Sequence, residues 1–127
     1  MSGSQKFYLC EKCKNLVALL AEGGGTLVCC GQPMTLLKAN TEDASQEKHV
    51  PDVKITGNEM TVQIGSVIHP MEEAHHIQFI YVETDKGGQL RQLAVGQEPV
   101  ATFTFTDESP IAVYEYCNLH GLWKKEV

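Results

Sequence analysis

Hydrophobic residues recur at every second position in several segments of the C-terminal two thirds of the chain. The clearest of these segments are residues 60–64, 77–83, 101–106 and 111–116. In the first of them, Met60, Val62 and Ile64 alternate with polar side chains. This period of two on branched and aromatic residues is typical of strands with one buried face. Glycine-containing turns at residues 57–58 and 86–88 flank the segments, as in hairpins, and the pattern therefore predicts a β-sandwich or a small barrel.

The first third of the chain has a different pattern, in which short apolar segments lie among cysteines. Residues 7–9 and 16–20 predict two strands, and three consecutive glycines at residues 23–25 predict a turn. A unit of this size cannot bury enough apolar surface to fold without a disulfide or a metal. We therefore expect a small domain whose fold depends on a bound metal.

A polar segment at residues 38–48 follows the small domain and is predicted to be a linker. We therefore expect two domains, residues 1–38 and residues 39–127, both mainly β, with no long helix. The distribution of charge supports this division. Lysines outnumber acidic residues four to two before residue 39, whereas acidic residues outnumber basic ones fourteen to six after it.

Composition limits the classes of protein to which the chain can belong. Hydrophobic residues make up 43% and charged residues 20%, a balance that supports a folded core. The net charge of −6 argues against nucleic-acid binding, because nucleic-acid binders are usually basic. No apolar segment approaches the roughly 20 residues needed to span a bilayer, and the polar N-terminus lacks a signal-type apolar segment. We therefore expect a cytoplasmic protein with no membrane partner.

Four of the five cysteines lie within the first thirty residues, in the pattern Cys10-x-x-Cys13 followed by the adjacent pair Cys29-Cys30. An odd cysteine count favours metal binding over a disulfide framework, and four thiolates form a tetrahedral site for zinc or iron. The adjacent pair departs from the usual zinc-ribbon spacing, and the spacing does not choose between the two metals. The alternatives are a strained Cys29–Cys30 disulfide and a thioredoxin-type Cys10–Cys13 pair, although the latter lacks its βαβ context.

The fifth cysteine and all five histidines lie in the second domain. The histidines are His49, His69, His75, His76 and His120. Cys117-x-x-His120 forms a hook that offers two metal ligands, and the segment from His69 to His75 can bring a loop across the same metal. A lone histidine is more often a core or surface residue, but imidazole and thiolate together suit zinc, copper, iron and nickel. These residues predict a second metal site.

Four ordered motifs with compatible gaps extend over nearly the whole chain. They are C-x-x-C followed by C-C at residues 10–30, E-K-H-V-P at 47–51, H-P-M-x-x-x-H at 69–75 and C-N-x-H-G-x-W at 117–123. This set resembles desulfoferrodoxin, the two-iron class of superoxide reductase. The resemblance implies a desulforedoxin-like N-terminal domain and an immunoglobulin-like β-sandwich or barrel, each of which holds one iron.

The resemblance also implies a ligand set for each iron. The ligands of the first iron are Cys10, Cys13, Cys29 and Cys30. The ligands of the second iron are four equatorial histidines and one axial cysteine, namely His49, His69, His75, His120 and Cys117. His76 falls where the family usually has an aromatic residue, so we expect it to flank the second iron without binding it. Ala74 is a departure, because relatives often have a lysine there.

The implied activity is the one-electron reduction of superoxide to hydrogen peroxide at the second iron in its ferrous form, without release of oxygen. Lys48 would attract the superoxide anion and support proton delivery, and Glu47 is a candidate sixth ligand of ferric iron after peroxide leaves. The expected partners are superoxide, a rubredoxin-like electron donor and a second copy of the chain in a homodimer. Two other functions stay open: a non-catalytic module that binds zinc or iron, and a hydrolytic zinc enzyme.

Overall fold

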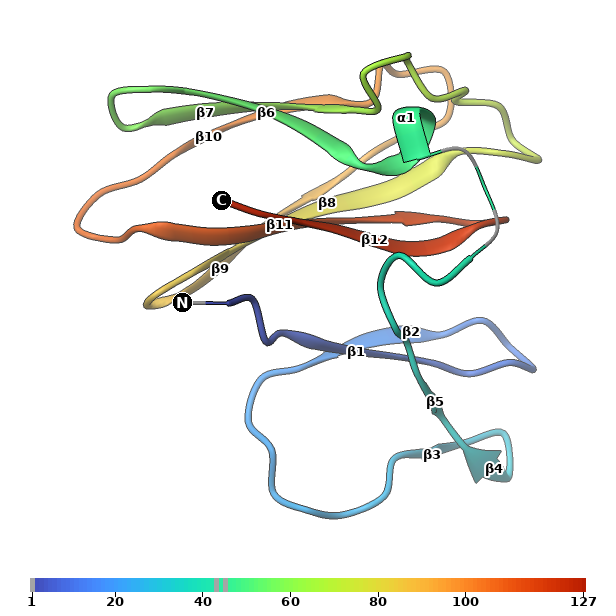
Figure 1. Cartoon of the computed structure of the whole chain (residues 1–127). Helices are drawn as coiled ribbons and strands as arrows, with labels where there is room; N and C mark the ends of the chain where they lie inside the picture. Colours follow the sequence, from blue (N-terminus) through green and yellow to red (C-terminus); the bar gives the residue numbers. More distant parts are fainter. Residues whose placement is uncertain (1, 43, 45) are drawn as a thin grey trace. The chain divides into compact units, whose positions relative to one another are not determined.

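The computed structural model describes every residue except 1, 43 and 45 (Figure 1). Contacts within the chain divide it into two units. The smaller unit is Ser4–Lys38, and the larger unit comprises Ala39–Val127 together with the residues before Ser4. The secondary structure is almost entirely β-strand, as the alternating pattern predicts, and each unit has its own sheets.

The smaller unit contains a three-stranded antiparallel sheet and a short hairpin. The sheet has the order β2-β1-β5, and the hairpin pairs β3 with β4; the strands are β1 (Lys6–Leu9), β2 (Leu16–Leu19), β3 (Val28–Cys29), β4 (Gln32–Pro33) and β5 (Thr35–Leu36). The strands predicted at residues 7–9 and 16–20 are therefore confirmed. The glycines at residues 23–25 lie in an irregular loop between β2 and β3 rather than in a tight turn.

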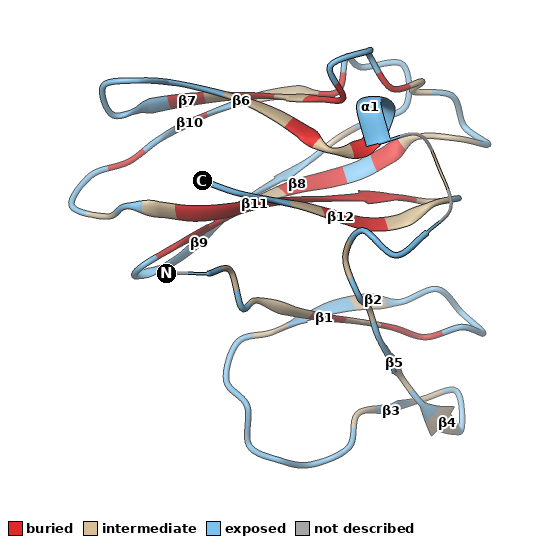
Figure 2. Cartoon of the chain, in the orientation of Figure 1, coloured by how far each residue is buried: buried red, intermediate tan, exposed pale blue. Residues whose placement is uncertain are grey.

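The smaller unit buries few side chains (Figure 2). Within residues 4–38 the buried residues are Phe7, Leu9 and Cys10. Three buried side chains give a very small apolar core, which is the condition under which a short domain depends on a metal or a disulfide for its stability.

The larger unit is a sandwich of two antiparallel sheets (Figure 1). One sheet has the order β10-β7-β6, formed by β6 (Pro51–Thr56), β7 (Glu59–Ile64) and β10 (Val100–Thr104). The other has the order β12-β11-β8-β9, formed by β8 (Ile77–Thr84), β9 (Gly87–Gln92), β11 (Pro110–Cys117) and β12 (Gly121–Glu126). The four alternating segments lie on β7, β8, β10 and β11, so the predicted β-sandwich is confirmed.

The core of the larger unit lies between its two sheets (Figure 2). The buried cluster consists of Met60, Val62, Ile64, Ile77, Ile80, Val82, Phe103, Phe105, Val113 and Cys117. Each fully buried large apolar side chain contributes roughly 1.5–3 kcal/mol, so this cluster supplies stabilisation that the smaller unit lacks. The cluster also contains Cys117, which brings a thiol to one end of the core.

Helical structure in the described residues is confined to a single turn, α1 (Gln46–His49). The prediction of a linker at residues 38–48 is therefore wrong at its last three residues. Only His49 is buried in α1, and a turn with one buried side chain has no helical periodicity for a sequence pattern to reveal. No helix in the described part of the chain is long and apolar enough to cross a membrane.

The two predicted hairpin turns differ in their agreement with the structure. The turn at residues 57–58 joins β6 to β7 as predicted, and its glycine has a φ of 61°. The turn between β8 and β9 falls at residues 85–86 rather than at 86–88. Gly88 instead lies in β9 against Tyr81, where a Cβ atom would collide with the ring. This glycine therefore serves close packing and not the turn.

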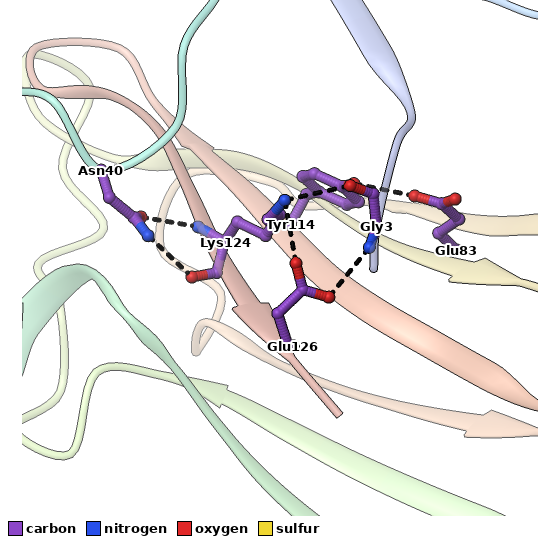
Figure 3. Close-up of polar contacts among 6 residues, drawn as sticks. All are labelled: Gly3, Asn40, Glu83, Tyr114, Lys124 and Glu126. Carbon is purple, nitrogen blue, oxygen red and sulfur yellow. Dashed lines mark hydrogen bonds and ion pairs between the residues drawn. The ribbon is translucent and has the colours of Figure 1, made fainter. Parts of the chain in front are cut away.

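Polar contacts on β12 hold the residues on either side of the smaller unit (Figure 3). The Nζ of Lys124 donates to the carbonyl of Gly3 at 3.1 Å, and the N–H of Gly3 donates to the carboxylate of Glu126 at 2.9 Å. Asn40 exchanges two hydrogen bonds with the backbone of Lys124, at 2.9 and 3.1 Å. The chain therefore leaves the larger unit and returns to it at neighbouring positions on β12.

Candidate metal centres

Four thiols of the smaller unit converge on one point. Cys10 and Cys13 lie at the turn that follows β1, and Cys29 and Cys30 lie at the turn of the β3–β4 hairpin. The four Sγ atoms lie within 4.8 Å of one another. The Sγ of Cys29 is 3.6 Å from that of Cys13 and 4.0 Å from that of Cys30. Because tetrahedral metal–sulfur bonds of about 2.3 Å separate the sulfurs by about 3.8 Å, the group fits one tetrahedral metal.

Local backbone conformation lets the two adjacent cysteines share this point. Cys30 and Gly31 have φ values of 52° and 78°, in the left-handed region that reverses the chain direction tightly. The separation of 4.0 Å between the Sγ atoms of Cys29 and Cys30 excludes a disulfide, whose bond is about 2.05 Å long. The adjacent pair can therefore supply two thiol ligands.

N–H groups around this point are directed at the sulfurs. The backbone N–H of Cys13 donates to Cys10 Sγ at 3.5 Å, and the backbone N–H of Asn15 donates to Cys13 Sγ at 3.5 Å. The side-chain amide of Asn15 donates to Cys29 Sγ at 3.8 Å. Hydrogen bonds of this kind stabilise the negative charge of thiolates, and Asn15 supplies two of them. The sequence motif did not assign a role to this residue.

The crowded thiols affect one another's ionisation. Backbone N–H donation, chiefly from Cys13, lowers the pKa of Cys10 to about 6. Hydrogen bonding with neighbouring thiols, first that of Cys13, raises the pKa of Cys30 to about 12 and also raises the pKa of Cys29. One thiolate therefore forms readily, whereas four thiolates need a cation to offset their repulsion. The group has the chemistry of a metal site.

In the larger unit, four histidines and a cysteine from separate elements meet at one end of the sandwich. His49 ends α1, His69 and His75 lie on the connection between β7 and β8, Cys117 ends β11, and His120 lies in the β11–β12 turn. The donor atoms of His49, His69, His75 and Cys117 lie within 4.8 Å of one another. His120 Nδ1 joins them, because it lies 3.1 Å from His49 Nε2 and 3.9 Å from Cys117 Sγ.

The four imidazoles form a square around a common centre. Going around the square from His49 to His69, His75, His120 and back, neighbouring ring centroids are 4.6–5.1 Å apart and the rings cross at 75–89°. His49 and His75 lie across a diagonal, with centroids 6.4 Å apart and rings at 29°. The longer separation of the opposite pair is what a square arrangement requires.

The spacing of the nitrogens discriminates between metal geometries. His49 Nε2 lies 3.1 Å from both His69 Nε2 and His120 Nδ1. These three atoms cannot all hydrogen bond to one another, because each ring nitrogen carries either one proton or one lone pair. Metal–nitrogen bonds of about 2.1 Å place neighbouring nitrogens about 3.0 Å apart at right angles and about 3.4 Å apart at tetrahedral angles. The spacing therefore favours a right-angled plane of ligands over tetrahedral zinc.

The histidine side chains present lone pairs to this centre. A carbonyl only accepts, so His69 Nδ1–H donates to the Pro70 carbonyl at 2.7 Å and leaves Nε2 unprotonated. His75 Nε2 is buried and has no hydrogen-bond partner in the described residues. Burial lowers the pKa of His69 to about 4 and also lowers the pKa of His75. Both rings are therefore neutral at pH 7, as metal ligands must be.

Cys117 approaches the square of imidazoles from the core. Its Sγ lies 3.5 Å from His69 Nε2, and the residue is fully buried. Burial raises the pKa of the Cys117 thiol, so a metal is needed to hold it as a thiolate at neutral pH. Glu115, two residues earlier, is also buried, and neither carboxylate oxygen has a hydrogen-bond partner among the residues described. Burial raises its pKa well above the usual value.

Two residues without a role in the sequence analysis hold the histidines in place. Trp123 stacks on His49, with ring centroids 5.0 Å apart, and its Nε1 donates to the carbonyl of His120 at 3.0 Å. Gly65 has a φ of 82°, and a Cβ atom there would lie 2.7 Å from the Cα of Lys48. Trp123 belongs to the C-N-x-H-G-x-W motif, whereas the need for Gly65 arises from a contact that the local sequence does not show.

The residues proposed for catalysis lie beside the second group of donors. Glu47 and Lys48 belong to α1, directly before His49, and their side chains are exposed. Besides burial and the charge of His120, the charge of Lys48 contributes to the lowered pKa of His75. The ammonium group is therefore close enough to influence a donor of this site.

His76 lies outside the square of imidazoles. Its Nδ1–H donates to the carbonyls of Glu72 and Glu73, at 3.0 and 3.1 Å. These contacts turn the ring toward the backbone of its own loop, in accord with the expected flanking position. Ala74 is exposed in the same loop and adds no charge there.

Comparisons with known proteins place both units in one family. The family model described as Desulfoferrodoxin matches residues 41–126, and the model described as Desulfoferrodoxin, N-terminal domain, matches residues 2–37. A desulfoferrodoxin from Syntrophotalea carbinolica is 47% identical over 126 residues, which cover 99% of each chain.

Solved structures give the same result. The superoxide reductase from Treponema pallidum has a TM-score of 0.81 and 35% identity, over 98% of this chain and 100% of its own. A one-iron superoxide reductase from Giardia intestinalis has a TM-score of 0.53 and 33% identity, over 64% of this chain and 97% of its own. With both units matched by the family models and nearly the whole length matched by a relative, the chain belongs to the desulfoferrodoxin family.

Proposed function

We propose that this protein is a superoxide reductase, which converts superoxide to hydrogen peroxide at an iron held in the larger unit. The observation that carries the proposal is the square of four imidazoles with a buried thiol on its core side. Imidazole nitrogens and a thiolate are donors suited to iron, and the right-angled spacing disfavours tetrahedral zinc. The superoxide reductases of Treponema pallidum and Giardia intestinalis among its structural relatives support this assignment.

The two groups of donors correspond to the two irons of a desulfoferrodoxin. We propose that the first iron is bound by Cys10, Cys13, Cys29 and Cys30. We propose that the second is bound by His49, His69, His75, His120 and Cys117. The donor distances and the buried, unpartnered Nε2 of His75 support this assignment.

The proposed ligands His49, His69, His75, His120 and Cys117 would hold a ferrous ion, which would supply the single electron that, with two protons, converts superoxide to hydrogen peroxide. The Cys117 thiolate would increase the electron density available to that ion. The residues around it must attract the anion and deliver the protons. Lys48 carries a positive charge directly beside His49, which opposes the repulsion that a net charge of −6 exerts on superoxide. Its exposed ammonium group can also exchange protons with water.

Glu47 is proposed as a carboxylate that would bind an iron held at the second site after the product has left. Its backbone carbonyl accepts hydrogen bonds from the Val67 N–H at 3.0 Å and the Ser66 hydroxyl at 3.3 Å. These bonds fasten the start of α1, whereas the carboxylate itself remains exposed. A fixed backbone with an exposed side chain allows the carboxylate to move without displacing His49.

The electron that restores the ferrous state must come from a donor outside this chain. We propose a small rubredoxin-like protein as that donor, and a cytoplasmic homodimer as the form of the protein that it reduces. An iron held by Cys10, Cys13, Cys29 and Cys30 would be a one-electron centre of the kind that such a carrier can reduce.

Iron quantitation combined with product analysis tests the proposed function. We expect two irons per chain, thiolate-to-iron absorption, and one hydrogen peroxide per superoxide consumed in the presence of excess reductant, with no oxygen released. Release of one oxygen molecule for every two superoxide ions consumed would identify a dismutase instead. Two colourless zinc ions in protein produced with ample iron would favour a non-catalytic module or a hydrolytic enzyme.

A further inference from the structure

Asn118 joins the two chain segments that carry His75 and Cys117. Its Oδ1 accepts the backbone N–H of His76 at 2.8 Å, and its Nδ2 donates to the carbonyl of Ala74 at 3.0 Å. Its own backbone N–H donates to the carbonyl of His76 at 3.2 Å. One residue therefore makes three hydrogen bonds to the two residues that flank His75, across more than forty positions of sequence. We infer that Asn118 is a positioning residue that fixes His75 relative to Cys117.

The loop that carries His75 is closed by a bridge of its own. Reciprocal backbone hydrogen bonds between Glu72 and His75, at 2.9 and 3.0 Å, form a single bridge within the loop. That bridge fixes the shape of the loop, whereas the bonds to Asn118 fix its place against the end of β11. The His75 Nε2 has no hydrogen-bond partner among the described residues, so the backbone of the loop must set the position of the ring.

The other three histidines each have a support of their own. His69 is oriented by the hydrogen bond from its Nδ1 to the Pro70 carbonyl. His49 stacks on Trp123, and the same indole donates to the carbonyl of His120. The contacts of Asn118 supply the equivalent support for His75. Removing them should therefore loosen one corner of the square and leave three corners in place.

This inference rests on the proposed ligand set, because His75 must bind iron for its position to matter. Groups that orient metal ligands typically contribute 10- to 100-fold to metal affinity. For Asn118→Ala we therefore expect the second iron to be lost to a chelator roughly 10- to 100-fold faster than in the unaltered protein. We also expect its thiolate-to-iron absorption to shift, while the four-cysteine iron keeps its spectrum and its rate of loss.

Asn40→Gly is the matched control. Asn40 also exchanges two hydrogen bonds with a backbone segment of the larger unit, at Lys124, but it contacts none of the proposed ligands. Glycine accommodates its φ of 61°, so the substitution removes the two bonds without backbone strain. This variant should lose some stability and keep the second iron and its spectrum.

Asn118→Asp separates a folding defect from a positioning defect. Aspartate keeps the oxygen that accepts from the His76 N–H but loses the N–H that donates to the Ala74 carbonyl. Hydrogen exchange at the His76 amide should therefore stay slow in Asn118→Asp. The same amide should lose its protection in Asn118→Ala. Loss of the second iron no faster in Asn118→Ala than in Asn40→Gly would overturn the inference. An unaltered protein without iron at the second site would instead overturn the proposed function, and the two failures are thus distinguishable.

Discussion

The residues around each proposed iron divide into those that supply donor atoms and those that set charge or orientation. Cys10 and His69 supply donors, and their lowered pKa values come from opposite causes: N–H donation to a thiolate in one case and burial of an imidazole in the other. Lys48 and Asn15 supply no donor atom, yet each places charge or an N–H dipole next to one. Their effects are therefore expected in rates and potentials and not in metal content.

Replacing Lys48 by alanine should slow the reaction with superoxide and leave both irons bound. Removing one positive charge beside the site weakens the attraction of the anion. The rate of reaction should fall by on the order of tenfold at low ionic strength and by less at high ionic strength. The rate of superoxide consumption at several salt concentrations measures this effect. Lys86→Ala is a suitable control, because Lys86 lies in the turn at the far end of β8 from His75. Equal salt dependence in both variants would exclude a steering role for Lys48.

Replacing Asn15 by alanine should make the reduction potential of the four-cysteine iron more negative. The side-chain amide of Asn15 donates to Cys29 Sγ, and such a bond stabilises the more negative reduced centre. If the reduced centre loses stabilisation on the order of 1 kcal/mol, its one-electron reduction potential falls by about 40 mV. A redox titration followed by absorption measures the shift, and the second iron serves as an internal reference. An unchanged potential would mean that this amide does not stabilise the reduced centre.

At the scale of elements, α1 and the connection after β7 must approach closely to bring His49 beside His69. Gly65 makes this approach possible because its backbone is left-handed and a Cβ atom would meet Lys48 and Val67. The N–H of Gly65 also donates to the carbonyl of Val50 at 3.2 Å. The helical turn that carries three residues of the proposed site is therefore held by the end of a strand.

Replacing Gly65 by alanine should destabilise the larger unit and displace α1. The positive φ alone costs on the order of 1–2 kcal/mol, and the collision with Lys48 adds to this. Gly57→Ala is the matched control, since Gly57 also has a positive φ but no atom within 4 Å of the added Cβ. The positive φ should lower the free energy of unfolding by a similar amount in both variants, and chemical unfolding measures this quantity. Slower superoxide reduction and altered iron absorption should occur in Gly65→Ala alone. Identical spectra and rates in the two variants would show that Gly65 has no role beyond its turn.

The alternating pattern predicted four strands of the sandwich and missed others. Segments on β7, β8, β10 and β11 were found because apolar residues recur at every second position in their sequences, although burial alternates cleanly in β7 and β11 is buried on both faces. Strand β9 is exposed along most of its length, and β12 buries the neighbouring pair Leu122 and Trp123, so neither has the period of a half-buried strand. The motifs indicated which donors to bring together. The roles of Asn118, Gly65 and Trp123 depend on tertiary contacts that no local spacing encodes.

At the scale of the whole molecule, the two units differ in what stabilises them. The larger unit has a buried apolar cluster between its sheets, whereas the buried residues of Ser4–Lys38 are Phe7, Leu9 and Cys10. We therefore expect metal–thiolate bonds to carry most of the stability of the smaller unit, as in other small metal-dependent domains. Loss of the metal should then have different consequences for folding at the two sites.

Removing both irons with a chelator under reducing conditions should unfold the smaller unit and leave the sandwich folded. Amide hydrogen exchange should show loss of protection throughout β1 and β2 and retained protection in β8 and β11. Replacing Cys13 by serine weakens the four-cysteine site only. This variant should lose protection in β1 and β2 and keep the iron of the second site. Collapse of protection in both units on chelation would show that the sandwich also depends on its metal.

The contacts of Lys124 with Gly3 and Asn40 give the chain the topology of an insertion. Both ends of the cysteine unit start from residues bound to one lysine of β12, and segments whose ends lie together are the ones that proteins gain or lose as blocks. Removal of one continuous stretch, with a short bridge in its place, would leave every strand of the sandwich in its order. Such a deletion should give a protein that keeps the second site alone, on an unchanged sandwich.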